Sequence, residues 1–342
     1  MATLFLRVAT IFFVLLPFQK TENVKTLEQE FQEVMEGRRP ANLYDPITYI
    51  LMQPGKRLRP QLVFDVVEMF DGDRQQARFV AMAFEMLHNF TLIHDDIMDE
   101  APIRRGKETV YKKWNSNIAI LSGDALAIMA FQQLLRLECD NQIILDIADL
   151  FSRTSIEICE GQQFDLDFET QEDVTIGEYM NMIRLKTAVM FAGCLQAGAI
   201  LVGADTDSQQ ALYDFGIHLG LAFQLADDVL DVYGDERTFG KAIGGDIRDN
   251  KKTYIYLKAL ELASEEQKAQ LKQLFAVPTD DFESKYATVR AIFDATGVKA
   301  FTDKMILDYA NMALADLERV QVAPLKKTVL KELVVKLIDR QK

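Results

Sequence analysis

Residues 82–102 read MAFEMLHNFTLIHDDIMDEAP, and this stretch decides the fold. Its apolar side chains recur three or four residues apart, which is the spacing of one helix face: Met82, Met86, Phe90 and Ile93. A run of acidic residues then ends the segment before Pro102: Asp95, Asp96, Asp99 and Glu100. The sequence therefore predicts a long apolar helix with carboxylates at its C-terminal end.

The rest of the chain predicts further helices of the same kind. No proline occurs between Pro102 and Pro278, and proline breaks helix interiors. The apolar spacing of a helix recurs at Leu27-Phe31-Met35, Leu62-Val66-Met69 and Leu212-Phe215-Leu219. Alternation typical of a half-buried strand is not sustained anywhere, so we expect about a dozen helices, no sheet and one all-α domain over 25–342.

Composition excludes several classes of protein. The chain has 342 residues, of which 49% are hydrophobic and 26% charged, as in an ordinary globular protein. A formal net charge of −14 and the lack of a basic face argue against binding to nucleic acid. The three cysteines form no CxxC pair and are expected to be reduced core thiols in a cytoplasmic protein: Cys139, Cys159 and Cys194.

The N-terminus carries an apolar run, Val8 to Phe18, directly after Arg7. It is about half of the roughly 20 residues that a membrane span needs. A signal peptide would fit the length, but no small-residue cleavage site follows Leu16. We expect residues 1–24 to be a poorly ordered extension and no stable membrane span, with a signal or anchor as the alternative.

A second acidic cluster repeats the first. Residues 223–231 read FQLADDVLD and echo residues 90–99, so both segments contain DDxxD. Residues i and i+4 share a helix face, so Asp95 should face Asp99, and Asp227 should face Asp231. Each like-charge pair costs about 0.2–0.5 kcal/mol, and acid at a helix C-terminus opposes the macrodipole by about 0.3–1 kcal/mol. A bound cation explains this arrangement, and oxygen-only ligands favour Mg²⁺.

Basic residues lie close to both clusters in the sequence. Arg104 and Arg105 follow the first cluster, while Lys241 and Lys251 follow the second. An earlier segment reads Gly55-Lys-Arg-Leu-Arg-Pro60. Arginine and lysine bind phosphate oxygens, and glycine lets the backbone approach an anion. Acid clusters beside such cations indicate a site for a metal-bound phosphate compound.

Together these motifs resemble the trans-polyprenyl diphosphate synthase family, which includes farnesyl and geranylgeranyl diphosphate synthases. The resemblance extends from about Lys25 to the C-terminus. It also includes residues 121–126 (LSGDAL), Gly161-Gln162 and Lys186-Thr187. It implies a bundle of long helices around a central cavity, a homodimer, and the Mg²⁺-dependent condensation of isopentenyl diphosphate with allylic diphosphates.

The same resemblance implies a role for each matching residue. It makes Asp95, Asp99 and Asp227 the ligands of three magnesium ions, with Asp96, Asp228 and Asp231 as supporting residues that bind metal-held water. It assigns the allylic diphosphate to Arg104, Lys186, Lys241 and Lys251. It assigns isopentenyl diphosphate to Lys56, Arg59, His88 and Arg105, and the allylic cation to Thr187 and Gln224. His94 and His218 match no family position and are expected to be structural.

Product length should depend on residues one to two turns before Asp95. One turn rises about 5.4 Å, comparable to one isoprene unit. On an ideal wheel Thr91 lies about 40° from Asp95, Leu87 about 80° and Phe90 about 140°. Phe90 is bulky and matches the family's length-determining position, while Thr91 is small. The resemblance therefore favours geranylgeranyl diphosphate (C20), with farnesyl diphosphate (C15) as the alternative; Phe90 could also be plain core packing.

Other functions remain open. A terpene cyclase uses the same metal, but its second motif is of the Asn/Ser/Glu type and it lacks the Gly55–Pro60 segment. A non-catalytic subunit that binds prenyl diphosphates would lose motif residues, and every expected residue is present here. A purely structural helical protein would leave both acid clusters unexplained.

Overall fold

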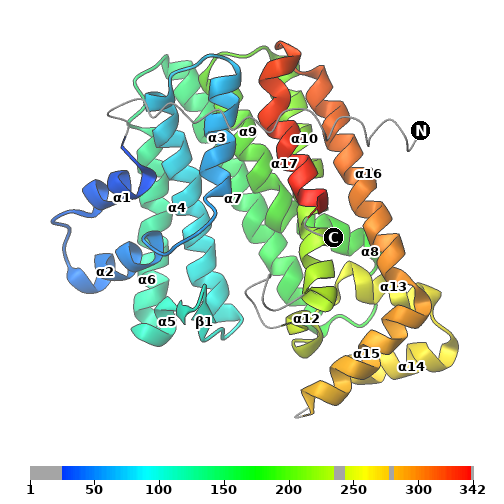
Figure 1. Cartoon of the computed structure of the whole chain (residues 1–342). Coiled ribbons are helices and arrows are strands. Elements are labelled where there is room, and N and C mark those ends of the chain that lie inside the picture. The colour runs from blue at the N-terminus through cyan, green and yellow to red at the C-terminus, as the bar shows by residue number, and fades with distance from the viewer. Residues whose placement is uncertain (1–24, 235–242, 277–280, 340–342) are drawn as a thin grey trace.

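The structure is a computed structural model that describes residues 25–234, 243–276 and 281–339. The expected N-terminal extension, residues 1–24, and Lys241 lie outside the described residues. The expected all-α fold is confirmed, because nearly all described elements are helices (Figure 1). Whether 25–342 forms a single domain stays a prediction.

Seven helices and a short hairpin make up the N-terminal half of the chain. They are α1 (Leu27–Met35), α2 (Ala41–Leu51), α3 (Leu58–Met69), α4 (Arg74–Met98), β1 (Ile103–Arg104), β2 (Lys107–Glu108), α5 (Val110–Lys113), α6 (Ser116–Leu134) and α7 (Asn141–Thr170).

The C-terminal half is helical throughout its described residues. Its elements are α8 (Ile176–Ile183), the π-helical turn η2 (Arg184–Ala188), α9 (Val189–Leu201), α10 (Thr206–Tyr233), α12 (Gly245–Arg248), α13 (Tyr254–Leu262), α14 (Glu265–Ala276), α15 (Phe282–Thr296), α16 (Val298–Arg319), the 3₁₀ turn η3 (Pro324–Lys327) and α17 (Thr328–Asp339).

Side-chain caps define where several helices begin. Thr26 and Thr175 form capping boxes with Gln29 and Glu178, at the start of α1 and α8. Aspartate caps α4, α7, α10 and α15 in the same manner. These side chains satisfy backbone N–H groups that have no partner within the helix. Local sequence therefore fixes the helix starts.

Helix α9 is the centre of the bundle. Between Val189 and Ile200 only Gln196 is not fully buried. It packs against α10, and glycine allows the two backbones to approach closely. A Cβ at Gly216 would lie 2.4 Å from the Ala192 Cα, and a Cβ at Gly220 would lie 2.5 Å from the Ala188 Cα. The small residues on this line therefore set the distance between the two central helices.

The prediction that the chain has no sheet is wrong in one place. Residues 103–108 form an antiparallel hairpin in which Ile103 pairs with Glu108 and Arg104 with Lys107. Arg105 and Gly106 occupy its turn with φ of 54° and 73°, as a two-residue type I′ turn requires. A pair of two-residue strands is too short for alternation to reveal it. The hairpin places Arg104 and Arg105 beside the acidic end of α4.

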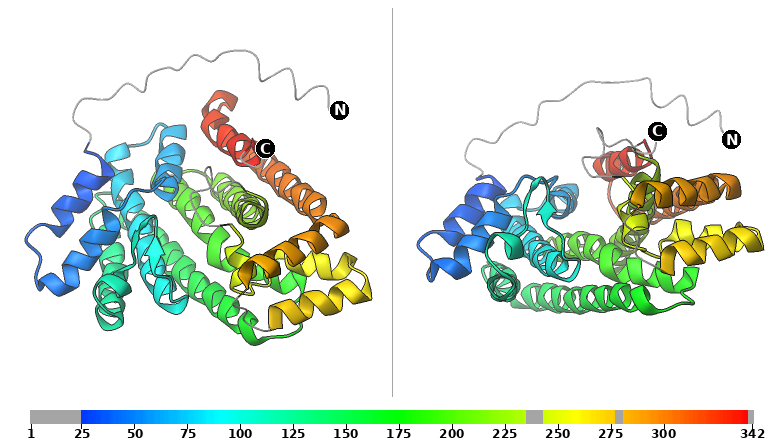
Figure 2. Two further views of the ribbon diagram at one scale, coloured as in Figure 1. Left: turned by 60° about the horizontal axis from the view of Figure 1, so that its bottom comes forward. Right: turned by 90° about the horizontal axis from the view of Figure 1, so that it is seen from below.

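The two acidic helix ends lie at the same end of the bundle. Figure 1 shows β1, which follows α4, and α12, which follows α10, at the lower end of the long helices. Figure 2 shows this end from two further directions. Helix topology therefore brings together carboxylates that are more than one hundred residues apart in the sequence.

Two helices are long and apolar enough to cross a membrane by length and composition alone. The segment Ile176–Leu201 is mostly buried, as the core helix of a globular protein would be. Less than half of Ser116–Leu134 is buried. This second helix therefore presents apolar surface that the described part of the chain does not cover.

The cysteines only partly follow the expectation of core thiols. All three are free, and Cys194 is buried, but Cys139 is half-buried and Cys159 is exposed. Cys159 follows the buried Ile158 on α7. Adjacent residues lie about 100° apart around a helix, so an apolar neighbour does not place a cysteine in the core.

The α9–α10 contact makes a direct prediction. Gly216→Ala should destabilise the protein by about 1–3 kcal/mol, because the added methyl group must push two backbones apart. Chemical denaturation of the variant measures the free energy of unfolding.

Gly177→Ala is the matched control. Gly177 is exposed near the start of α8, and a Cβ there meets only the Thr175 Oγ1 at 3.9 Å. This variant should keep or slightly raise stability, since alanine favours helix. Equal stability of the Gly216 variant and the wild type would contradict the proposed close packing.

Candidate active site

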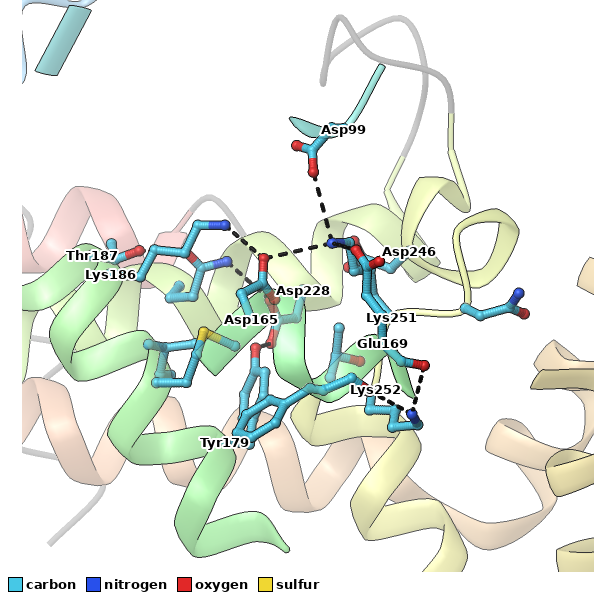
Figure 3. A pocket seen from close by; sticks show the side chains of 16 residues that line it. Asp99, Asp165, Glu169, Tyr179, Lys186, Thr187, Asp228, Asp246, Lys251 and Lys252 are labelled. Carbon is cyan, nitrogen blue, oxygen red and sulfur yellow. Dashed lines mark hydrogen bonds and ion pairs between the residues drawn. The ribbon is translucent and has the colours of Figure 1, made fainter. Parts of the chain in front are cut away.

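A polar cavity of about 170 Å³ lies beside the acidic helix ends. Its lining includes Asp99, Asp165, Lys186, Thr187, Gln224 and Lys251 (Figure 3). These side chains come from the end of α4, from α7, from η2, from α10 and from the loop before α13. The cavity thus joins several segments that sequence analysis assigned to one site.

The three aspartates of the first cluster have different surroundings. Asp96 is fully buried and accepts a hydrogen bond from the Arg104 Nε at 2.6 Å. Burial raises the pKa of Asp96 to about 6, although Arg104 opposes the rise. Burial also raises the pKa of Asp95, against the effect of Lys186. Asp99, the residue that ends α4, is exposed and lies 3.9 Å from the Lys251 Nζ.

The second cluster repeats this division of environments. Asp228 is 3% exposed and accepts hydrogen bonds from the Tyr179 hydroxyl and from the Gln224 Nε2. Burial raises the pKa of Asp228 to about 7, and the two hydrogen bonds hold it lower than burial alone would. Both carboxylate oxygens of Asp231 accept backbone N–H groups, from Gly245 and Asp246. Asp231 therefore joins the first turn of α12 to the end of α10.

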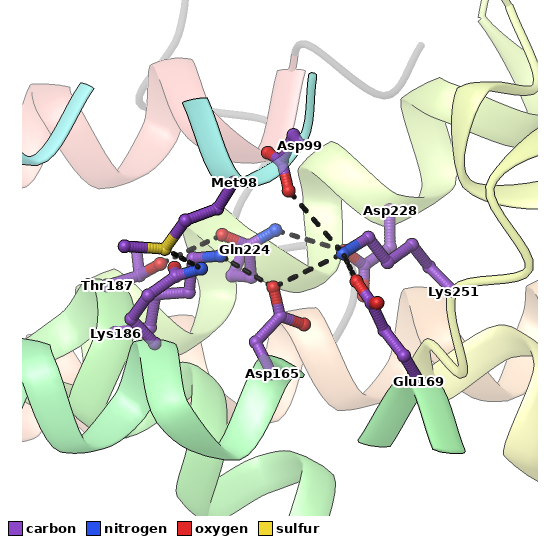
Figure 4. A network of polar contacts seen from close by, with 10 residues as sticks. Met98, Asp99, Asp165, Glu169, Lys186, Thr187, Gln224, Asp228 and Lys251 are labelled. Atoms are coloured by element: carbon purple, nitrogen blue, oxygen red, sulfur yellow. Dashed lines mark hydrogen bonds and ion pairs between the residues drawn. The ribbon is translucent and has the colours of Figure 1, made fainter. Parts of the chain in front are cut away.

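Asp165 forms ion pairs with two of the lysines that line the cavity, Lys186 and Lys251 (Figure 4). Its Oδ2 lies 2.6 Å from the Lys186 Nζ and 3.5 Å from the Lys251 Nζ. Burial alone would raise the pKa of Asp165, but the two lysines outweigh it and lower the pKa. Burial likewise opposes the charge of Lys251, but Asp165, Asp99 and Glu169 raise its pKa. Both lysines lie beside Asp165 and line the cavity.

An unusual backbone presents Lys186 and Thr187 to this cavity. Both residues lie in the π-helical turn η2, between α8 and α9. Turns of this type often occur at functional sites because they break the regular spacing of side chains. Gly161 on α7 allows the approach, because a Cβ there would lie 2.3 Å from the Lys186 backbone nitrogen. The Thr187 hydroxyl in turn donates to the Gln224 Oε1 at 3.0 Å.

A second cationic group surrounds His88. The Arg59 Nη1 donates to the His88 Nε2 at 3.2 Å. Burial, followed by the nearby arginines Arg59, Arg105 and Arg104, holds the pKa of His88 well below its usual value. The imidazole is therefore neutral, and the excess charge around it belongs to guanidinium groups that attract an anion.

Buried contacts hold this arginine-rich group in place. Arg57 donates to Glu85, which is 2% exposed, at 2.5 Å, and to the Gln53 carbonyl oxygen at 3.1 Å. Gly55 leaves room for Arg105, whose Nη1 would lie 3.2 Å from a Cβ at that position. The ion pair between Arg57 and the buried Glu85 thus holds the Gly55–Pro60 segment against α4.

The predicted site residues fall into three groups. The structure brings Asp95, Asp99, Lys186, Thr187, Gln224, Asp228 and Lys251 to one polar region, and Arg59, His88 and Arg105 to the next. Asp227 is half-buried on α10 one residue before Asp228, Lys56 lies within the Gly55–Pro60 segment, and Lys241 is outside the described residues. Their assignments to metal and to substrate stay predictions.

Sequence reasoning missed several residues of the cavity. Asp165, Glu169, Tyr179 and Asp246 line it, but none lies in a DDxxD motif or beside a basic pair. One signal was available for Asp165, because it lies one helical turn after Gly161 and therefore near the close contact with η2. His94 and His218 have structural contacts: His94 packs on Gly123, and His218 lies 2.6 Å from Asp316.

Comparisons with known proteins agree with this geometry. The Polyprenyl synthetase family model matches residues 40–293. A short chain isoprenyl diphosphate synthase of Methanothermobacter thermautotrophicus is 38% identical over 85% of this chain and 88% of its own. A geranylgeranyl diphosphate synthase of Methanosarcina mazei is 35% identical over 92% of this chain and 95% of its own.

A solved structure gives the same result in three dimensions. The crystal structure of a geranylgeranyl pyrophosphate synthase superposes with a TM-score of 0.87 at 45% identity, and covers 93% of this chain and 100% of its own. The fold, the carboxylate-lined cavity and these similarities together show that the chain belongs to the polyprenyl synthetase family and is a trans-prenyltransferase.

Proposed function

We propose that this prenyltransferase adds isopentenyl diphosphate to allylic diphosphates and releases geranylgeranyl diphosphate as its main product. One observation supports the proposal above all: two anion-binding groups of different composition lie side by side. Lys186 and Lys251 are surrounded by carboxylates, whereas Arg59 and Arg105 surround a neutral His88. Two different diphosphates therefore have two different places to bind.

The acidic group fits magnesium. Mg²⁺ takes oxygen ligands and is usually held by one or two carboxylates together with substrate phosphates. Asp95 and Asp99 could supply such oxygens from one wall, and Asp227 from the other. Among the described residues no group of three or more acidic, histidine or cysteine side chains could hold a metal ion alone. About three magnesium ions would be held there together with the allylic diphosphate, and they would supply positive charge that neutralises the leaving group.

The protein's own side chains then account for the remaining steps. Lys186 and Lys251, with Lys241, hold the allylic diphosphate while its carbon–oxygen bond breaks and negative charge develops on it. Arg104 assists from its ion pair with Asp96. Lys56, Arg59 and Arg105 hold isopentenyl diphosphate beside His88.

Condensation follows from that placement. The allylic fragment becomes a carbocation beside Thr187 and Gln224, which present oxygen atoms to it. The double bond of isopentenyl diphosphate attacks the cation and forms the new carbon–carbon bond. The released diphosphate takes the proton that restores the double bond, since it is the base closest to the reacting carbons.

The product length of C20 is proposed to depend on α4 residues before Asp95, none of which lines the cavity of about 170 Å³. Phe90 is half-buried, and its ring packs edge-on against His94 at 4.7 Å between centroids. Thr91 turns its hydroxyl back to the His88 carbonyl oxygen at 2.8 Å. Leu87 is 2% exposed and packs in the core. We propose that Phe90 forms the floor of the product site. Thr91 would then lie beside the prenyl tail of the product, and Leu87 would lie behind Phe90.

We also propose a cytoplasmic homodimer. Exposed apolar side chains gather on α6 and α7: Ile120, Leu121, Ile128, Phe131, Leu145, Ile156 and Phe164. A patch of this kind is typical of a protein interface, and a second copy of the same chain is its proposed partner. The free thiols suit a reducing compartment.

Activity should depend on both Mg²⁺ and Asp95. With labelled isopentenyl diphosphate, Mg²⁺ and a C5, C10 or C15 allylic starter, the protein should make a C20 product. Chelation of the metal should stop turnover, and Asp95→Ala should lower kcat by at least about a hundredfold. Chromatography of the dephosphorylated products reads both the rate and the chain length.

Asp149→Ala is the control for this experiment, because Asp149 is an exposed residue of α7 that pairs only with Arg153. A C15 end point would favour the farnesyl alternative, and a cyclised hydrocarbon would favour a terpene cyclase. The absence of product from every starter would support a non-catalytic subunit and overturn the proposal.

Phe90→Ala should lengthen the product by one or more isoprene units, because loss of the ring opens about one helical turn of space. The same product assay measures the shift. Phe301→Ala removes an exposed ring on α16 and should leave the product at C20. An unchanged product from the Phe90 variant would place this residue in the core packing alone.

The proposed interface predicts a mass of two chains by light scattering. Replacing Leu121 and Ile128 together with glutamate should give a monomer, because charged residues oppose burial of the α6 face. A matched replacement of the exposed Val329 and Val335 on α17 should remain dimeric. A monomeric wild type would exclude the homodimer.

A further inference from the structure

Four side chains form one continuous hydrogen-bond chain along the wall of the cavity (Figures 3 and 4). Tyr179 of α8 donates its hydroxyl to the Asp228 Oδ2. The Gln224 Nε2 donates to the Asp228 Oδ1 at 3.1 Å. The Thr187 hydroxyl donates to the Gln224 Oε1 at 3.0 Å. The chain thus runs from a buried tyrosine to the two residues proposed to face the allylic cation.

The donors and acceptors of this hydrogen-bond chain follow a fixed order. Asp228 receives two donors and gives none, so it is the acceptor at which the chain converges. Because the amide nitrogen of Gln224 is committed to Asp228, its carbonyl oxygen must point the opposite way, toward Thr187. The hydroxyl hydrogen of Thr187 is in turn committed to that oxygen. The oxygen lone pairs of Thr187 and Gln224 are therefore available to face the cavity, and the second N–H of the Gln224 amide is the donor that remains.

Burial makes Tyr179 important to this arrangement. Tyr179 and Asp228 line the cavity but are each only 3% exposed, so little of either side chain is open to solvent. Without that donor, one largely buried oxygen of Asp228 would lose a hydrogen-bond partner. Asp228 would then turn, and the amide of Gln224 would be free to reverse. A reversed amide would present its N–H groups, the positive end of its dipole, to the cation.

Tyr179 is itself fixed by its helix. The Thr175–Glu178 capping box starts α8, and Tyr179 follows it directly. Its ring belongs to the buried apolar cluster that also contains Met182, Ile183 and Leu225. Neither its backbone nor its ring is free to follow a moving carboxylate.

We propose that Tyr179 is a positioning residue of the condensation reaction, which sets the direction of the Asp228–Gln224–Thr187 chain so that oxygen atoms face the allylic carbocation. The proposal rests on the proposed function, because it requires a carbocation in this cavity. It also makes Asp228 the acceptor that links Tyr179 to Gln224, in place of the expected contact with metal-held water.

The test compares two unreactive ligands in the full-length protein with Mg²⁺. One is an allylic diphosphate analogue with an ammonium nitrogen at the position of the cationic carbon. The other is the thiolo-diphosphate of the same chain length, which has no positive charge at that position. Tyr179→Phe should weaken binding of the ammonium analogue about tenfold and leave the thiolo analogue within twofold. In turnover, kcat should fall by a similar factor while both KM values stay unchanged.

Tyr256→Phe is the matched control. Tyr256 is 5% exposed on α13, where it stacks on Phe275. It takes no part in the hydrogen-bond chain from Tyr179 to Thr187. Removal of its hydroxyl should not distinguish the two ligands. Equal weakening of both ligands by Tyr179→Phe would make Tyr179 a structural residue, and no change in either would make its hydroxyl dispensable. Both results would overturn the proposal.

A second variant keeps the test decisive if Tyr179→Phe does not fold. In Asp228→Asn the new amide can donate to Gln224, which would reverse the orientation of the Gln224 amide. The variant should therefore show the same selective loss of affinity for the ammonium analogue. Retained affinity in that variant would overturn the proposal. Because these readouts measure binding, an inactive wild type that still binds both ligands would contradict the proposed function and leave the role of Tyr179 separately measurable.

Discussion

The ion pairs between Asp165 and the two lysines place positive charge inside the acidic end of the bundle. Helix topology collects carboxylates from α4, α7 and α10 in one place, and such a cluster repels itself unless cations lie within it. Lys186 and Lys251 supply that charge from opposite sides of Asp165. The lysines are thereby held extended toward the cavity before any substrate binds. If the proposed diphosphate replaces Asp165 as their partner, it meets two cations already in place, so little conformational entropy would be lost on binding.

The two DDxxD motifs share one sequence pattern, but their aspartates have different surroundings. In each motif the middle aspartate turns inward, Asp96 to Arg104 and Asp228 to Tyr179 and Gln224. Helix geometry separates the first two positions, because the second residue lies about 100° around the helix from the first. The third positions differ, since Asp99 is exposed at a helix end and Asp231 binds the first turn of α12. Carboxylates of one motif therefore serve separate purposes.

Sequence reasoning predicted the helices well, because helix periodicity and helix caps are local. It also predicted that Asp99, Lys186, Gln224 and Lys251 would meet, through the resemblance to a family and not through spacing. It failed where contacts join distant segments. Tyr179 has no local signature and Asp165 only its position one turn after Gly161, since their importance depends on how closely α7 and α8 approach η2 and α10. The hairpin that carries Arg104 and Arg105 was missed because two-residue strands have no measurable period. The exposure of Cys159 was missed because it follows a buried residue, Ile158, and yet lies on the exposed face of α7.

Charge also sorts the two substrates. Around His88 the arginines outnumber the buried carboxylates Glu85 and Asp96, so a bare diphosphate is attracted without help. Around Lys186 the carboxylates dominate, and a bare diphosphate would meet like charge from Asp95, Asp99 and Asp165. The two cationic groups therefore differ in what surrounds them, because the lysines lie among carboxylates and the arginines lie around a neutral imidazole. An anion that carries divalent cations would meet less repulsion beside the lysines than a bare anion would. This difference in local charge is the physical basis of the proposed division of the two diphosphates between the two groups.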